Sequence, residues 1–120
     1  KKVYYGLEQK GCYYNSLAIA RDLLAQNGIS AQLIGAQEVD DDYRIRFAGP
    51  FDLVISLISW GFHYPVSTYL DQVYALMRPG GVLILDIRKD SDGIDTIKKK
   101  FGNAKMIHSA RKYVRVLAKK

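Results

Sequence analysis

The sequence predicts an α/β domain in which a mostly parallel sheet is flanked by helices and ends in an antiparallel hairpin. Two apolar runs, residues 51–57 and 82–85, show almost no polar alternation, which is typical of parallel strands buried on both faces. A stretch with helical periodicity separates these runs. The last two strand-like segments, 104–107 and 113–118, are only a few polar residues apart, so they can pair only as an antiparallel hairpin.

Chain length and composition fit one domain. The 120 residues are 48% hydrophobic and 25% charged, an ordinary globular balance. No apolar run reaches the roughly 20 residues that span a bilayer, the N-terminus lacks a signal-peptide pattern, and the single Cys12 excludes an internal disulfide framework. We therefore expect a single domain over residues 1–120, no membrane, and a reducing, cytoplasmic setting.

The first elements follow from local signals. Residues 3–7 read as a short strand that ends at Glu8. Asn15 or Ser16 can cap the helix that follows, whose apolar residues recur at helical spacing, and Asn27-Gly28 can close it.

Two strands and a loop are expected next. Residues 31–36 read as a second strand, and a turn at Gly49-Pro50 leads into the strand over 51–57. The stretch 60–65, WGFHYP, reads as a loop.

The second half begins with a helix. Thr68 and Asp71 fit a capping box that opens it, and Pro79-Gly80-Gly81 ends it. The strand over 82–85 then ends on Asp86, and a further helix is expected over 92–102 before the hairpin. Because ligands of open parallel sheets bind beyond the carboxyl ends of the strands, Asp86 marks the edge where chemistry is expected.

Four segments resemble one family. FDLVISLISWGFHYP and YLDQVYALMRPGGVLILD resemble the fourth and fifth strands of the Rossmann-like class I S-adenosylmethionine-dependent methyltransferases, in which the intervening helix ends in a hydrophobic residue, a basic residue and Pro-Gly-Gly. The terminal hairpin is similar to the family's sixth and seventh strands. The helix NSLAIARDLLAQNG resembles the one between its second and third strands. The resemblance implies methyl transfer from S-adenosylmethionine to an oxygen or nitrogen of a small-molecule substrate.

One part of the family pattern is missing. The family's first strand ends in a glycine-rich loop that the cofactor approaches closely, and no Gly-x-Gly-x-Gly occurs here. The nearest stretch, residues 6–11, places a carboxylate and a lysine where small residues belong. We therefore expect residues 1–8 to correspond to the family's second strand, the first strand and helix to be absent, and this chain alone to be an inactive, partial methyltransferase fold.

The resemblance implies the cofactor-binding residues. Glu8 would accept hydrogen bonds from the ribose hydroxyls, although an acid at a strand end can also simply cap the next turn. Gln37 or Glu38 would meet the adenine amino group. Ser56 and Leu57 would lie along the methionine and sulfur.

The aromatic stretch after the fourth strand would receive the substrate. Trp60 and Tyr64 would line the mouth of the site, or else pack the loop against the following helix. His63 is the candidate catalytic base, because a neutral imidazole can take a hydroxyl proton near pH 7. The two histidines lie 45 positions apart and no metal-ligand spacing is visible, so no metal is expected.

The charge distribution leaves a second function open. Residues 96–120 hold nine Lys or Arg and no acid, whereas the first 95 residues carry a net charge of −3. Lysines on an edge hairpin guard against aggregation, but a basic region can also hold an anionic partner. The alternative is a noncatalytic methyltransferase-fold scaffold that binds nucleic acid or another anionic partner through this region. A small-molecule substrate is the favoured partner, and no pattern indicates an oligomeric state.

Overall fold

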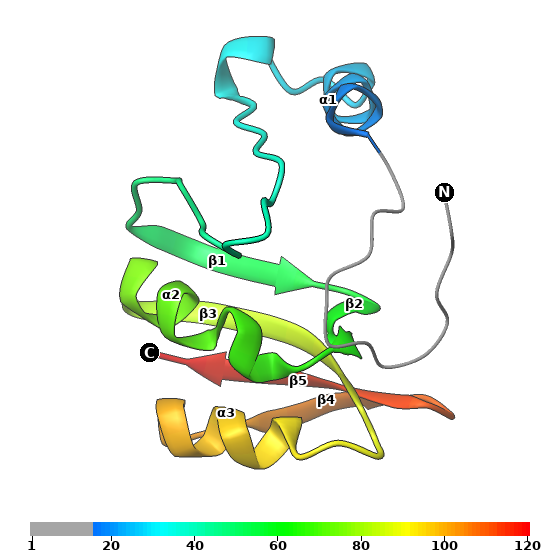
Figure 1. Cartoon of the computed structure of the whole chain (residues 1–120), viewed down its shortest axis with the longest axis vertical. Coiled ribbons are helices and arrows are strands. Elements are labelled where there is room, and N and C mark those ends of the chain that lie inside the picture. Colours follow the sequence, from blue (N-terminus) through cyan, green and yellow to red (C-terminus); the bar gives the residue numbers. More distant parts are fainter. Residues whose placement is uncertain (1–15) are drawn as a thin grey trace.

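A computed structural model describes residues 16–120. The elements in chain order are α1 (Leu17–Gln26), a 3₁₀ turn η1 (Ala31–Leu33), β1 (Phe51–Ser56), β2 (Ser59–Tyr64), a 3₁₀ turn η2 (Val66–Thr68), α2 (Leu70–Leu76), β3 (Met77–Arg88), α3 (Gly93–Phe101), β4 (Lys105–Ser109) and β5 (Tyr113–Lys119). The expected strand 3–7 and Glu8 lie outside the described residues. Figure 1 shows α2 and α3 beside the sheet and α1 apart from it.

The sheet is mixed, and the expectation of a mostly parallel sheet is wrong. Its strand order is β1-β3-β5-β4. β1 and β3 pair in parallel, as predicted, with Ser56 beside Leu85. β5 runs antiparallel to both β3 and β4, which confirms the terminal hairpin. Because β5 returns into the sheet beside β3, antiparallel pairings outnumber parallel ones.

One face of the sheet carries the core. Leu83, Leu85 and Ile87 of β3 have no exposed surface. They form one cluster with residues of η2, α2, α3 and β5: Val66, Leu70, Val73, Ile97, Phe101, Val114, Val116 and Ala118. Burying these side chains is the main favourable term in folding, at about 25 cal/mol per Å² of apolar surface removed from water.

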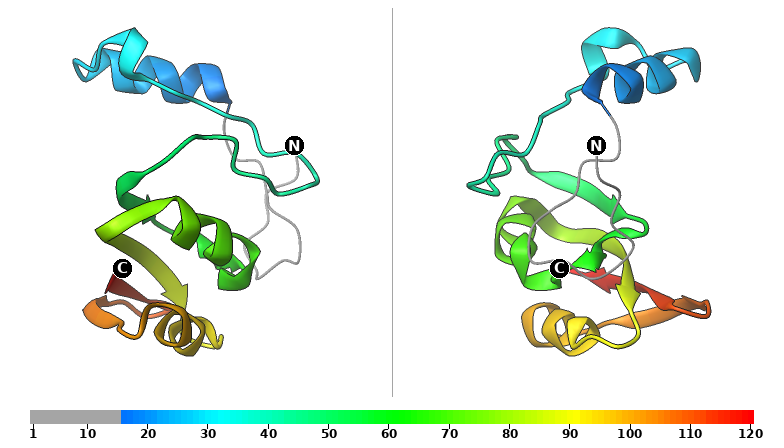
Figure 2. Two further views of the ribbon diagram at one scale, coloured as in Figure 1. Left: turned by 90° about the vertical axis from the view of Figure 1, so that its left-hand side faces the viewer. Right: turned by 45° about the vertical axis from the view of Figure 1, so that its right-hand side comes forward.

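The expectation that the strands are buried on both faces is wrong for the described residues. On the other face, Leu53 and Ile55 of β1 are half exposed, and Val82 and Ile84 beside them are only partly buried. Helix α1 does not cover this face. It is capped as predicted, since Ser16 Oγ accepts from Ile19 N at 3.3 Å, but none of its residues is buried. Figure 2 shows the same separation of α1 from the sheet in two further views.

Three local predictions are corrected. Residues 31–36 form the turn η1 and irregular chain instead of a strand. The stretch expected to be a loop forms β2, which lies against β3. The capping box fails, because Thr68 belongs to η2 and the N-cap position is taken by Tyr69, whose side chain does not cap the helix. Helix α2 therefore begins at Leu70.

Candidate functional site

Asp86 is the centre of a polar cluster at the carboxyl ends of β1 and β3. Its side chain has no exposed surface. One carboxylate oxygen accepts from Arg115 Nε at 2.7 Å, and the other accepts from Arg115 Nη2 at 2.9 Å and from Ile58 N at 3.1 Å. Asp86 thus joins the end of β3 to β5 and to the turn after β1.

The ion pair between Asp86 and Arg115 stabilises the charged form of the arginine. The hydrogen bond with Asp86 raises the pKa of Arg115 above its ordinary value, against the opposing effect of burial. The guanidinium therefore stays charged across the whole pH range in which a protein stays folded. The bidentate geometry also compensates the cost of burying the Asp86 carboxylate.

The turn between β1 and β2 is held in an uncommon conformation. Ile58 has φ of 48°, a left-handed value that is unfavourable for a β-branched residue. Two hydrogen bonds fix the turn: Asp86 accepts from Ile58 N, and Ser56 Oγ accepts from Trp60 N at 3.1 Å. Backbone strain of this kind costs about 1–3 kcal/mol and often occurs at functional sites.

Leu57 and Ile58 present this turn at the molecular surface. They are 49% and 48% exposed, although the carboxylate beneath them is buried. The structure therefore brings Ser56 and Leu57, two of the predicted cofactor residues, beside Asp86 and Arg115 at the carboxyl ends of two parallel strands.

Trp60 lies in the core rather than at an open mouth. Its side chain is 5% exposed, Nε1 donates to the Val66 carbonyl at 2.9 Å, and its ring meets Tyr69 edge-on at 5.9 Å between centroids. Tyr64 also meets the Tyr69 ring edge-on. For Trp60 the geometry favours the packing alternative, in which the aromatic stretch holds β2 against η2 and α2.

His63 is enclosed in β2. It is 8% exposed, and its ring lies edge-on to Phe62 at 4.9 Å between centroids. The candidate base is therefore shielded from bulk water in this conformation.

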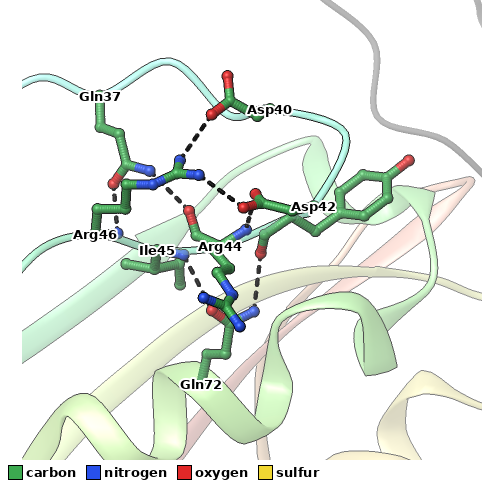
Figure 3. A network of polar contacts seen from close by, with 8 residues as sticks. Gln37, Asp40, Asp42, Arg44, Ile45, Arg46 and Gln72 are labelled. Atoms are coloured by element: carbon green, nitrogen blue, oxygen red, sulfur yellow. Dashed lines mark hydrogen bonds and ion pairs between the residues drawn. The ribbon is translucent and has the colours of Figure 1, made fainter.

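Gln37 belongs to a separate polar network, shown in Figure 3. Its amide accepts from Arg46 N at 2.6 Å and donates to the Arg44 carbonyl at 2.7 Å, so it pairs two stretches of one loop. Arg46 forms ion pairs with Asp40 and Asp42. Glu38 in the same loop is exposed.

Gln72 attaches this loop to α2. Its Oε1 accepts from Ile45 N at 3.0 Å and its Nε2 donates to the Tyr43 carbonyl at 2.8 Å. Through these two hydrogen bonds, the main chain of the loop pairs with a side chain instead of with a neighbouring strand. Figure 3 shows both bonds beneath the Gln37 network. Gln37 and Glu38 therefore belong to a loop that is attached to α2, and neither residue forms a hydrogen bond or ion pair with the Asp86 cluster.

Sequence reasoning pointed to Asp86 but missed Arg115 and Ile58. Arg115 had a signal: it is the one charged residue in the otherwise apolar run YVRVLA, and a charged side chain in a largely buried strand is usually paired. The left-handed turn at Ile58 had none, because glycine or asparagine is the residue type that normally marks one.

Within residues 16–120, no group of three or more His, Cys, Asp or Glu side chains could hold a metal ion. Across the same residues, no helix is long and apolar enough to span a bilayer.

No protein-family model matches this chain, and no curated protein or solved structure matches it significantly. Its function is therefore inferred from its own residues.

Proposed function

We propose that this chain belongs to an S-adenosylmethionine-dependent methyltransferase that acts on an oxygen or nitrogen of a small molecule. The main support is the parallel pairing of β1 and β3. The buried Asp86 carboxylate of β3 accepts a hydrogen bond from Ile58 N, just after β1, and so links the carboxyl ends of the two strands. In open α/β sheets this edge is where ligands bind. The Rossmann-like resemblance of the same two strands supplies the ligand class.

The residues at this edge fit the proposed cofactor in part. Leu57 and Ile58 expose a fixed turn to which an extended ligand has access. Ser56 and Leu57 are the residues that the resemblance implies for the methionine end. Gln37 fits less well, because both ends of its amide are bonded within its own loop.

The cofactor supplies an electrophilic methyl group when bound. The chain's own part is to hold the cofactor along Ser56 and Leu57, to admit the acceptor past Tyr64, and to remove the acceptor proton with His63. Because His63 is enclosed, it accepts this proton only if the acceptor reaches into β2 or if β2 opens locally.

Cofactor binding by this chain is expected to be weak and confined to the turn after β1. The family's glycine-rich loop would supply several hydrogen bonds worth about 1 kcal/mol each, and losing two or three costs about 30-fold to 150-fold in affinity. Calorimetry at micromolar S-adenosylmethionine should show little heat. At millimolar concentrations, amide chemical shifts should change at Leu57, Ile58 and Gly61 and stay constant at Gly80.

Leu57→Glu should abolish those shift changes, since it places a charged side chain on the proposed binding surface. Leu53→Glu is a matched control, because Leu53 lies within β1, four residues before Leu57, and is 50% exposed against 49% for Leu57. Changes that map to the amino end of β3, or that survive Leu57→Glu, would contradict the proposed function.

His63→Ala should lower by about 100-fold any methyl transfer that the chain supports at millimolar cofactor, because general-base catalysis contributes that much. It should leave the cofactor-induced shifts unchanged. His108→Ala is the control, since His108 is exposed on β4. Equal activity in the two variants would remove His63 from the mechanism.

A further inference from the structure

Seven cations gather at the end of the sheet opposite the Asp86 cluster. These residues, here called the lysine end, are Arg78, Lys98, Lys99, Lys100, Lys105, Lys119 and Lys120. They come from the start of β3, the last turn of α3, the start of β4 and the end of β5. Figure 1 shows these four places on the side of the molecule where the C-terminus lies.

Hydrogen bonds fix this arrangement. Asn103, between α3 and β4, accepts from Lys119 N and donates to the Lys119 carbonyl, both at 2.8 Å. Gly80 N donates to the Lys120 carbonyl at 2.7 Å. The end of α3, the start of β4, the end of β5 and the beginning of β3 are therefore held together.

Most of these charges are not neutralised within the described chain. Arg78 pairs with Asp52, and Lys100 pairs with Asp71 at 2.6 Å. Lys98, Lys99, Lys105 and Lys119 form no ion pair with any of residues 16–120 and are exposed. A surface of like charges destabilises the folded chain, and an anionic partner would relieve that repulsion.

A groove of about 390 Å³ adjoins the lysine end, between α2 and α3. Its lining combines two hydroxyls and two ammonium groups with one carboxylate and one leucine: Ser67, Thr96, Lys99, Lys100, Asp71 and Leu70. Hydroxyl and ammonium groups are the usual protein contacts of nucleic-acid phosphates. Leu70 is buried, so the groove offers no exposed apolar side chain for insertion into a lipid surface.

We propose that this groove binds a backbone phosphate of a nucleic acid, and that Lys98, Lys105 and Lys119 contact neighbouring phosphates without reading the base sequence. Asp71 opposes the ligand, since its carboxylate lies on the groove and pairs with Lys100. The surface lies away from the turn after β1, so this inference does not depend on the proposed methyl transfer.

The first test compares two triple variants that lose the same charge. Affinity for a labelled nucleic-acid oligomer is measured by fluorescence anisotropy between 50 and 200 mM salt. Lys98→Gln/Lys99→Gln/Lys105→Gln should bind about 100-fold more weakly at 0.1 M salt, with the salt dependence reduced by about three phosphate contacts. Lys89→Gln/Arg111→Gln/Lys112→Gln removes cations from the opposite, hairpin end, where Lys89 N donates to the Lys112 carbonyl, and should bind nearly as the parent does.

The second test predicts a gain, which misfolding cannot imitate. Asp71→Asn should bind several-fold more tightly, because it frees Lys100 and removes the negative charge from the groove. Asp90→Asn is the control, since Asp90 also pairs with one cation, Arg88, but neither residue lines the groove.

Equal weakening by the two triple variants, or no gain from Asp71→Asn relative to Asp90→Asn, would overturn the proposal. Binding to vesicles rich in anionic phospholipid without binding to the oligomer would also overturn it and assign the surface to a membrane. Cofactor-induced shifts at Leu57 are expected to be the same in all of these variants, so failure here and failure of the proposed function are distinguishable.

Discussion

Asp86→Ala should lower the free energy of unfolding by about 3–5 kcal/mol, the usual cost of breaking a buried ion pair. Asp86 has no exposed surface and accepts three hydrogen bonds, two from Arg115 and one from Ile58 N. Without the Asp86 carboxylate, the Arg115 guanidinium loses its ion-pair partner and the strained turn at Ile58 loses one of its two hydrogen bonds. Urea unfolding followed by the fluorescence of the buried Trp60 measures the change.

Asp52→Ala is the control for this prediction. Asp52 also pairs with an arginine, Arg78, at 2.6 Å, but its side chain is 70% exposed. Exposed ion pairs contribute only about 0–1 kcal/mol, so this variant should unfold nearly as the parent does. Similar losses in the two variants would show that Asp86 is not the buried anchor described here.

Gly61→Ala should lower the free energy of unfolding by about 2–4 kcal/mol. Gly61 has φ of 88°, and an added Cβ would lie 2.9 Å from the Asp86 carbonyl oxygen. The left-handed conformation alone costs about 1–2 kcal/mol for an alanine. The contact with backbone adds more, because β2 must move away from β3 to relieve it.

Gly28→Ala separates these two causes. Gly28 has nearly the same φ, 86°, but an added Cβ would meet no atom within 4 Å. This variant should therefore show the conformational cost without the steric one. Thermal unfolding of both variants gives the difference, and equal losses would mean that β2 and β3 do not pack this closely.

The candidate site was only partly predictable. Position alone indicated that β1 ends near Ser56, and Leu57 follows it in the turn, because a long apolar run limits where its strand can end. The environments of Trp60 and Gln37 were not predictable from position. Whether the Trp60 indole lines a cleft or fills a core depends on the elements that pack against it, which here are η2 and α2. Whether an amide is available for a ligand depends on which backbone groups approach it.

The failed strand at residues 31–36 shows a general difference between helices and strands. Helix α1 satisfies its hydrogen bonds internally, so its cap and periodicity were sufficient to place it. A strand has no such internal bonds and exists only where another strand pairs with it. No strand among residues 16–120 pairs with this segment, and its apolar residues instead join a turn and irregular chain.

The sequence by itself determined helices α1 and α3, strands β1 and β3, where the terminal hairpin turns, and how unevenly charge is distributed along the chain. These properties can be predicted from the sequence because they depend on residues that are close together in the chain. Tertiary structure alone decided that β5 inserts beside β3, that Asp86 meets Arg115 across that pairing, and that cations from four elements share one end of the sheet. Each of these brings together residues separated by tens of positions, and the free energy that selects them comes from burying one common core rather than from any local preference.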